Sequence, residues 1–233
     1  MGQPEELAPG VFQVPVLGAQ VWLLIDEPVI LIDTGTRGSG RALLAALATL
    51  GHRPEALACV ALTHYHPDHV GALPELLARC PGLRVAIHAA EAPYVRAPAT
   101  LPNPFQTPRA RALAAPFWPL ARLRQPCRVD VPLAEADVLP GRPDVRVVHL
   151  PGHTRGSIAF HLPRHGLVLA GDAFERRGGQ LGPPSARFTE DPDAARASIR
   201  RLAALEFDAL GLSHWRPIHQ GAATAVRALA AQA

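Results

Sequence analysis

Residues 63–69 of the chain read Thr63-His64-Tyr65-His66-Pro67-Asp68-His69. From His64 onward it follows a short apolar run, residues 57 to 63, which has the length and composition of a buried strand. Four of its side chains carry imidazole or carboxylate groups, which bind zinc and also iron or manganese: His64, His66, Asp68 and His69. Because His64 and His66 alternate along the backbone, both can face one ion. Asp68 and His69, beyond the proline, can turn toward a second ion.

Four ligands cannot complete two metal sites, so further ligands must come from elsewhere in the chain. Three candidates each follow a predicted strand directly: His153, Asp172 and His214. Functional groups gather on loops at strand ends, which favours all three. His219 lies five positions after His214 and competes for the last place. His214 is favoured because it comes immediately after the predicted strand.

Apolar patterns elsewhere predict strands and helices in alternation. Two β-branched runs, 21–25 and 29–32, flank a turn signal and indicate a hairpin. Helices are predicted at about 39–51, 73–80, 191–205 and 222–231. Further strands are predicted at 84–88, 127–131, 145–150, 157–162, 166–170 and 209–212, and residues 64–71 are expected to be a loop. Two sheets packed face to face with helices outside would accommodate this order within a single domain, residues 1–233.

Residues 97–126 are rich in proline and aromatic side chains and keep no regular period. We expect a lid-like excursion with one short helix near 109–114. Its arginines could capture an anionic substrate group or simply be solvated: Arg109, Arg111, Arg122 and Arg124. Its aromatic side chains could form a pocket wall or a dimer contact: Phe105, Phe117 and Trp118.

Composition excludes several classes of function. The formal net charge is only +3 over 233 residues, which is not the footprint of a nucleic-acid-binding protein. Three cysteines without a CxxC motif favour a reducing compartment over a disulfide framework. The N-terminus has no secretory pattern, and no apolar run is long enough to span a bilayer. We therefore expect a soluble, cytoplasmic protein that acts on a small molecule, without nucleic acid or membrane partners; a homodimer is left open.

Five pieces of the sequence, in this order, resemble the metallo-β-lactamase fold superfamily. They are Leu31–Gly35, Thr63–His69, Pro151–Thr154, Ala170–Asp172 and Ser213–Ile218. They extend over nearly the whole chain. The resemblance implies an α/β fold, an αββα sandwich of two mixed β-sheets flanked by helices, with metal ions at one edge.

The resemblance also implies a role for each candidate ligand. His64, His66 and His153 would hold one ion; Asp68, His69 and His214 would hold the second; and Asp172 would bridge both. Asp33 resembles a buried carboxylate that supports the ligand loop. One departure is Trp215, because the family often has glycine after this histidine, and the bulkier side chain could narrow the site.

Two neighbouring ions predict a hydrolase, because a bridging water loses a proton near neutral pH and can attack an electrophilic carbonyl or phosphoryl centre. Asp68 is the best candidate for moving the proton. We expect two divalent ions, with zinc favoured over iron or manganese, and a small ester, lactone, thioester or phosphodiester as substrate. Nothing in the sequence matches the glutathione-binding basic residues of the family's thioesterase branch.

Two alternatives remain at this stage. A relative with the same fold binds one iron and oxidises a persulfide, using many of the same ligands. A non-enzymatic metal-binding module would bind metal tightly without turnover. Metal content and oxygen uptake would separate these hypotheses from the hydrolase.

Overall fold

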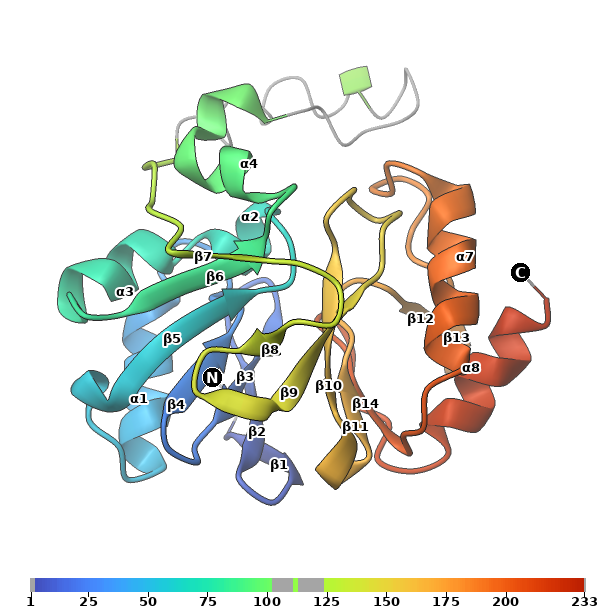
Figure 1. The fold of residues 1–233 in the computed structure, drawn as a ribbon, viewed down its shortest axis with the longest axis horizontal. Helices are drawn as coiled ribbons and strands as arrows, with labels where there is room; N and C mark the ends of the chain where they lie inside the picture. The colour runs from blue at the N-terminus through green and yellow to red at the C-terminus, as the bar shows by residue number, and fades with distance from the viewer. Residues whose placement is uncertain (1–2, 102–110, 113–123, 233) are drawn as a thin grey trace.

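The computed structural model describes residues 3–101, 111–112 and 124–232. Figure 1 shows two sheets packed face to face, with helices covering both outer faces. This arrangement confirms the predicted αββα sandwich. It follows from the sequence pattern, because most strands are buried on both faces and need a cover on each side.

The larger sheet contains seven strands, arranged in chain order from β1 to β7. The hairpin predicted around residue 27 is present, with Trp22 opposite Ile32 in an antiparallel pair. From β4 onward the strands are parallel. The bounds are β1 Glu5–Ala8, β2 Val11–Pro15, β3 Gln20–Leu24, β4 Val29–Ile32, β5 Leu57–Leu62, β6 Arg84–His88 and β7 Val131–Leu133.

The second sheet has five strands in the order β14-β11-β10-β9-β8, with β11 and β14 parallel and the other pairs antiparallel. A separate two-stranded ribbon, β12–β13, follows β11 in the chain. The bounds are β8 Val138–Leu139, β9 Arg142–His149, β10 Ile158–Leu162, β11 Leu167–Leu169, β12 Glu175–Arg177, β13 Gln180–Gly182 and β14 Ala209–Gly211.

Three apolar clusters hold the layers together. One lies between the larger sheet and helices α1 and α3, and includes Leu43 and Leu76. The second lies between the sheets and contains Trp22 and Phe160, both fully buried. The third joins the smaller sheet to α7 and α8. The helices are α1 Gly40–Thr49, α2 Pro67–Val70, α3 Leu73–Arg79, α4 Ala92–Arg96, α7 Pro192–Ala203 and α8 Ala222–Ala230.

Two local predictions were wrong. The strand expected at 127–131 lies instead at Val131–Leu133, since only these residues pair with β6. Residues 64–71 are not all loop, because Pro67 begins the single-turn helix α2. Of the excursion at 97–126, residues 111 and 112 are helical, while 102–110 and 113–123 lie outside the described residues, together with Arg109, Arg122 and the three aromatic side chains. Among the described helices, none is long and apolar enough to cross a bilayer.

Candidate metal centre

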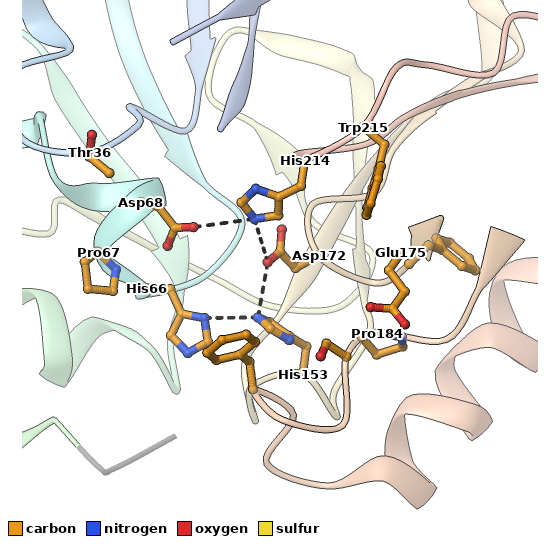
Figure 2. Close-up of a pocket in the computed structure, with 13 residues that line it drawn as sticks. Thr36, His66, Pro67, Asp68, His153, Asp172, Glu175, Pro184, His214 and Trp215 are labelled. Atoms are coloured by element: carbon orange, nitrogen blue, oxygen red, sulfur yellow. Dashed lines mark hydrogen bonds and ion pairs between the residues drawn. The ribbon is translucent and has the colours of Figure 1, made fainter. Parts of the chain in front are cut away.

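All seven predicted ligand side chains come from strand ends that meet at one edge of the sandwich. β5 delivers the His64–His69 stretch, the loop after β9 carries His153, and the loops after β11 and β14 carry Asp172 and His214. Figure 2 shows five of them around one pocket, linked in the sequence Asp68, His214, Asp172, His153, His66. The structure therefore brings together segments from both halves of the chain.

The ligand atoms form three overlapping groups. Within each group, one nitrogen or oxygen atom from each residue lies within 4.8 Å of the others. The groups are His64-His66-His153, His64-His69-Asp172 and Asp68-His69-His214. Because His64 and His69 each belong to two groups, the three form one continuous cluster rather than separate sites.

Asp172 lies at the middle of this cluster. Its Oδ2 atom is 3.1 Å from His214 Nε2 and 3.5 Å from His153 Nε2, and its Oδ1 atom is 3.4 Å from His69 Nε2. A single carboxylate thus faces nitrogens from both sides of the cluster. This position suits a ligand shared by two ions.

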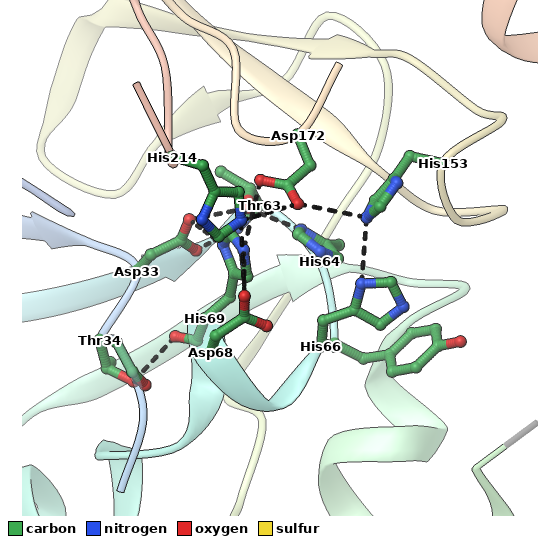
Figure 3. A network of polar contacts seen from close by, with 12 residues as sticks. Asp33, Thr34, Thr63, His64, His66, Asp68, His69, His153, Asp172 and His214 are labelled. Atoms are coloured by element: carbon green, nitrogen blue, oxygen red, sulfur yellow. Dashed lines mark hydrogen bonds and ion pairs between the residues drawn. The ribbon is translucent and has the colours of Figure 1, made fainter. Parts of the chain in front are cut away.

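Asp33 lies behind the cluster, where it holds His69 in place (Figure 3). Its Oδ2 atom is 2.8 Å from His69 Nδ1 and accepts a hydrogen bond from the Thr63 hydroxyl, while Oδ1 accepts one from the Thr63 backbone. A proton on Nδ1 leaves the Nε2 lone pair of His69 directed into the site, as metal binding requires. Asp33 has a φ of +60°, an uncommon backbone conformation for a residue with a side chain.

Glu91 is a second buried carboxylate, and the sequence reasoning missed it. It accepts hydrogen bonds from the backbone of Tyr65 and Gly156 and from the Thr154 hydroxyl, at 2.8 to 3.0 Å. It therefore ties the loop of His64 and His66 to the loop of His153. Burial raises the pKa of Glu91 to about 7, although the three donors favour the ionised form. The sequence signal that could have found Glu91 is its position three residues after the end of β6, close to a strand end.

Tyr65 stands between two ligand histidines but does not reach the pocket. Its side chain is fully buried, and its hydroxyl donates a hydrogen bond of 2.9 Å to Glu190. The other carboxylate oxygen of Glu190 accepts from the backbone of Arg155. Tyr65 is thus a link between the same two loops.

Glycine is required just before His153. Gly152 has a φ of +139°, and a Cβ atom there would lie 2.2 Å from the backbone nitrogen of Ala195. The loop therefore packs directly against the start of α7, where Asp191 caps the helix through the backbone of Asp193 and Ala194. This close approach positions His153.

Burial keeps the imidazoles of the first group neutral. It lowers the pKa of His64 and of His66 well below the usual histidine value, and neighbouring imidazoles act in the same direction. Burial also lowers the pKa of His153. Burial acts in the same way on His69, but Asp172 and the other nearby carboxylates raise its pKa well above the usual value. Neutral imidazole is the form that ligates metal.

The buried polar atoms fit a metal centre. Among the described residues, His64 Nε2, His69 Nε2 and Asp172 Oδ1 are buried without a hydrogen-bond partner. His66 Nδ1 and His153 Nε2 lie 3.0 Å apart, facing each other. Buried polar atoms are normally satisfied, and a cation would satisfy these acceptors together.

Other histidines lie outside the cluster. His219, the competing candidate, pairs with Glu5 at 2.9 Å, whereas His214 lies beside Asp68 and His69. His88 stacks on His149 with ring centres 4.2 Å apart.

A pocket of about 610 Å³ opens over the cluster. This volume falls within the range of roughly 300–1,000 Å³ that small-molecule sites occupy. Trp215 lines it, as anticipated from its place beside His214 (Figure 2). The site can therefore admit a small molecule to within reach of the ligand atoms.

Comparison with known proteins agrees with this geometry. The family model of the metallo-β-lactamase superfamily matches residues 14–214. The chain is 31% identical to a probable metallo-hydrolase, YflN, of Bacillus subtilis strain 168, over 91% of this chain and 86% of that protein. It is 30% identical to a hydroxyacylglutathione hydrolase of Stenotrophomonas maltophilia, over 79% of this chain and 56% of that protein. The chain spans about half the length of the hydroxyacylglutathione hydrolases it matches.

Solved structures show the same fold. A metallo-β-lactamase family protein of Thermus thermophilus, TTHA1429, superposes with a TM-score of 0.74 at 28% identity, over 97% of this chain and 80% of that one. TTHA1623, solved in a di-iron-bound form, gives a TM-score of 0.65 at 30% identity, over 88% and 91% of the two chains. Sequence, fold and the convergence of the predicted ligands agree: the chain belongs to the metallo-β-lactamase superfamily, among its metal-dependent hydrolases.

Proposed function

We propose that the protein hydrolyses small thioesters or related esters with two divalent metal ions bound at the cluster. The observation that carries the proposal is the convergence of seven histidine and aspartate side chains beneath a pocket open to a small molecule. The hydroxyacylglutathione hydrolases among the relatives favour a thioester over the lactone and phosphodiester alternatives.

Each ion would have its own ligands. His64, His66 and His153 would hold one, with His66 Nδ1 and His153 Nε2 already facing each other. The second would be held by Asp68, His69 and His214. Asp172 would be shared. The imidazole and carboxylate donor set is compatible with zinc, iron or manganese.

When bound, two such ions make water a nucleophile at neutral pH and polarise a carbonyl oxygen. Water then adds its oxygen to the acyl carbon, the carbon–sulfur bond breaks, and the departing thiolate needs a proton. Asp68 is placed to carry that proton, because its side chain lines the pocket and its Oδ2 atom lies 3.4 Å from His214 Nε2. The products are a carboxylate and a thiol.

The remaining protein groups position these ligands. Asp33 orients His69, and Glu91 ties together the loops of His66 and His153. Such supporting groups are typically worth about 10- to 100-fold in metal affinity or activity.

The test is a panel of chromogenic thioester, ester, lactone and phosphodiester substrates on protein of measured metal content. We expect two ions per chain and metal-dependent release of thiol. One iron per chain with oxygen uptake would favour the persulfide oxidation hypothesis instead. Tight metal binding without turnover of any substrate would favour a binding module.

A further inference from the structure

Large apolar side chains that are exposed gather near the pocket. Among the described residues, four large hydrophobic side chains are exposed: Leu17, Val138, Phe188 and Trp215. Phe188 and Trp215 line the pocket, with 40% and 39% of their surfaces exposed. Clustered exposed apolar surface beside a cavity marks a ligand contact, whereas a single exposed side chain needs no explanation.

Leu17 belongs to a loop that borders the same pocket. Its carbonyl oxygen accepts hydrogen bonds from the backbone and the hydroxyl of Thr36, a lining residue. The next residue, Gly18, approaches Asp68 so closely that a Cβ atom there would lie 3.4 Å from the Asp68 Cβ. The two exposed apolar side chains that line the pocket, Phe188 and Trp215, come from two separate loops. Neither Leu17 nor Val138, on β8, lines the pocket itself.

The described ionisable side chains that line the pocket include no lysine or arginine. Besides the candidate metal ligands, the described lining contains one ionisable group, Glu175, whose carboxylate pairs with Arg177. Phe174, Pro184 and Ser185 complete this wall. A substrate group that rests here gains apolar contact, and among the described lining residues it would find no arginine or lysine to pair with a negative charge.

We propose that this pocket selects uncharged, apolar acyl substrates, whose hydrocarbon part packs against Trp215 and Phe188. The inference rests on the proposed hydrolytic function and narrows its substrate class. The acyl carbon would lie over the cluster, between Asp68 and Asp172, while the chain extends toward the aromatic side chains. Thioesters whose acyl chain ends in a carboxylate are poorer substrates.

The experiment compares N-acetylcysteamine thioesters carrying acetyl, butyryl, hexanoyl and octanoyl groups, with metal-loaded protein and thiol release as the readout. We expect kcat/KM to rise roughly two- to fourfold for each added methylene until the pocket is filled, as partial to full burial of a methylene predicts. The N-acetylcysteamine monothioester of adipic acid, whose six-carbon acyl chain ends in a carboxylate, should react more slowly than the neutral hexanoyl thioester. Arg124 interacts electrostatically with Asp68, and a cation near the pocket would favour an anionic substrate. The comparison of the charged and neutral thioesters therefore tests the charge preference.

Variants locate the effect on the aromatic side chains. Trp215→Ala should flatten the dependence on chain length, and Trp215→Phe should restore most of it. Phe188→Ala provides a second route to the same loss. Val138→Ala is the matched control, since this side chain is 45% exposed but does not line the pocket, and it should retain the wild-type dependence.

The outcomes separate the inference from the proposed function. Hydrolysis of every thioester with the same kcat/KM, a preference for the adipoyl monothioester over the hexanoyl thioester, or an unchanged dependence in both alanine variants would overturn the inference alone. Failure to hydrolyse any thioester or ester would overturn the proposed function, and the inference with it.

Discussion

The group formed by His64, His66 and His153 is buried, with at most 7% of any of these residues exposed. In the group formed by Asp68, His69 and His214, only His69 is buried to that degree, and the other two side chains are 32% and 35% exposed. The two groups differ in support as well. Glu91, Glu190 and the close contact at Gly152 hold the loops of the first, whereas His214 precedes the exposed Trp215.

This contrast suggests a division of work between the groups. Ligands that are buried and held in place can keep an ion with little exchange, as closed sites do. A partly exposed group leaves room for solvent and substrate beside its ion. We therefore expect the first group to determine whether the centre is assembled, and the second to determine how substrate is processed.

The largest effect is expected from removing a ligand of the buried group. His66→Ala should remove one ion and lower kcat by at least about 10³-fold, because metal assistance contributes several kcal/mol. In His214→Ala the loss of kcat should be roughly tenfold smaller, because water can take the place of a ligand at an open position. Metal analysis and thioester turnover measure both. Equal losses in the two variants would remove the distinction between the groups.

A smaller but more selective loss is expected at Asp68. Asp68→Asn retains a possible oxygen ligand but cannot carry a proton, so kcat should fall about 10²- to 10³-fold while KM changes little. Steady-state kinetics on protein of matched metal content separates the two constants. A rise in KM that accounts for the whole loss would assign Asp68 to substrate binding instead.

The third effect is expected at Glu91, which holds the loops of the buried group, and concerns the pH dependence of the unfolding free energy. Burial raises its pKa from 4.5 to about 7 in the folded protein. A raised folded-state pKa means that this contribution to stability is full below pH 4.5 and is lost as pH rises toward 7. We expect the advantage of the wild type over Glu91→Gln in unfolding free energy to shrink by up to roughly 3 kcal/mol across that window.

Denaturant unfolding of the metal-free proteins at several pH values measures this difference. The comparison of the two proteins cancels the titration of the other groups, because glutamine at position 91 does not titrate. A difference that stays constant from pH 4.5 to 7 would contradict the assignment of the shift to Glu91.

The smallest effect is expected at Asp33. In an Asp33→Asn variant the new side chain could still accept from the Thr63 backbone, but its amide would face His69 Nδ1 and favour the wrong tautomer. Affinity for the ion at the partly exposed group, which includes His69, should fall about 10- to 100-fold, with the other ion retained. Competitive chelation measures the affinity for each of the two ions. Asp193→Asn, at an 88% exposed side chain, is the control and should bind metal normally.

Much of the fold could be predicted from local patterns. The hairpin around residue 27, the strand before His64 and the helix beginning at Pro192 all follow from periodicity and turn or cap residues. The short strands β1, β8 and β12 were not predicted. Each is 4 residues or fewer and only partly buried, so its pairing depends on a neighbour rather than on its own composition.

The sequence by itself determined which side chains could bind metal and the order in which strand ends present them, because ligand chemistry and strand periodicity are local properties. Only the tertiary structure decided that these side chains meet within a few ångströms, that one group is buried and the other partly open, and that Glu91 joins two ligand loops. Burial and distance between residues far apart in the chain depend on how the two sheets and their loops pack. No local pattern carries that information.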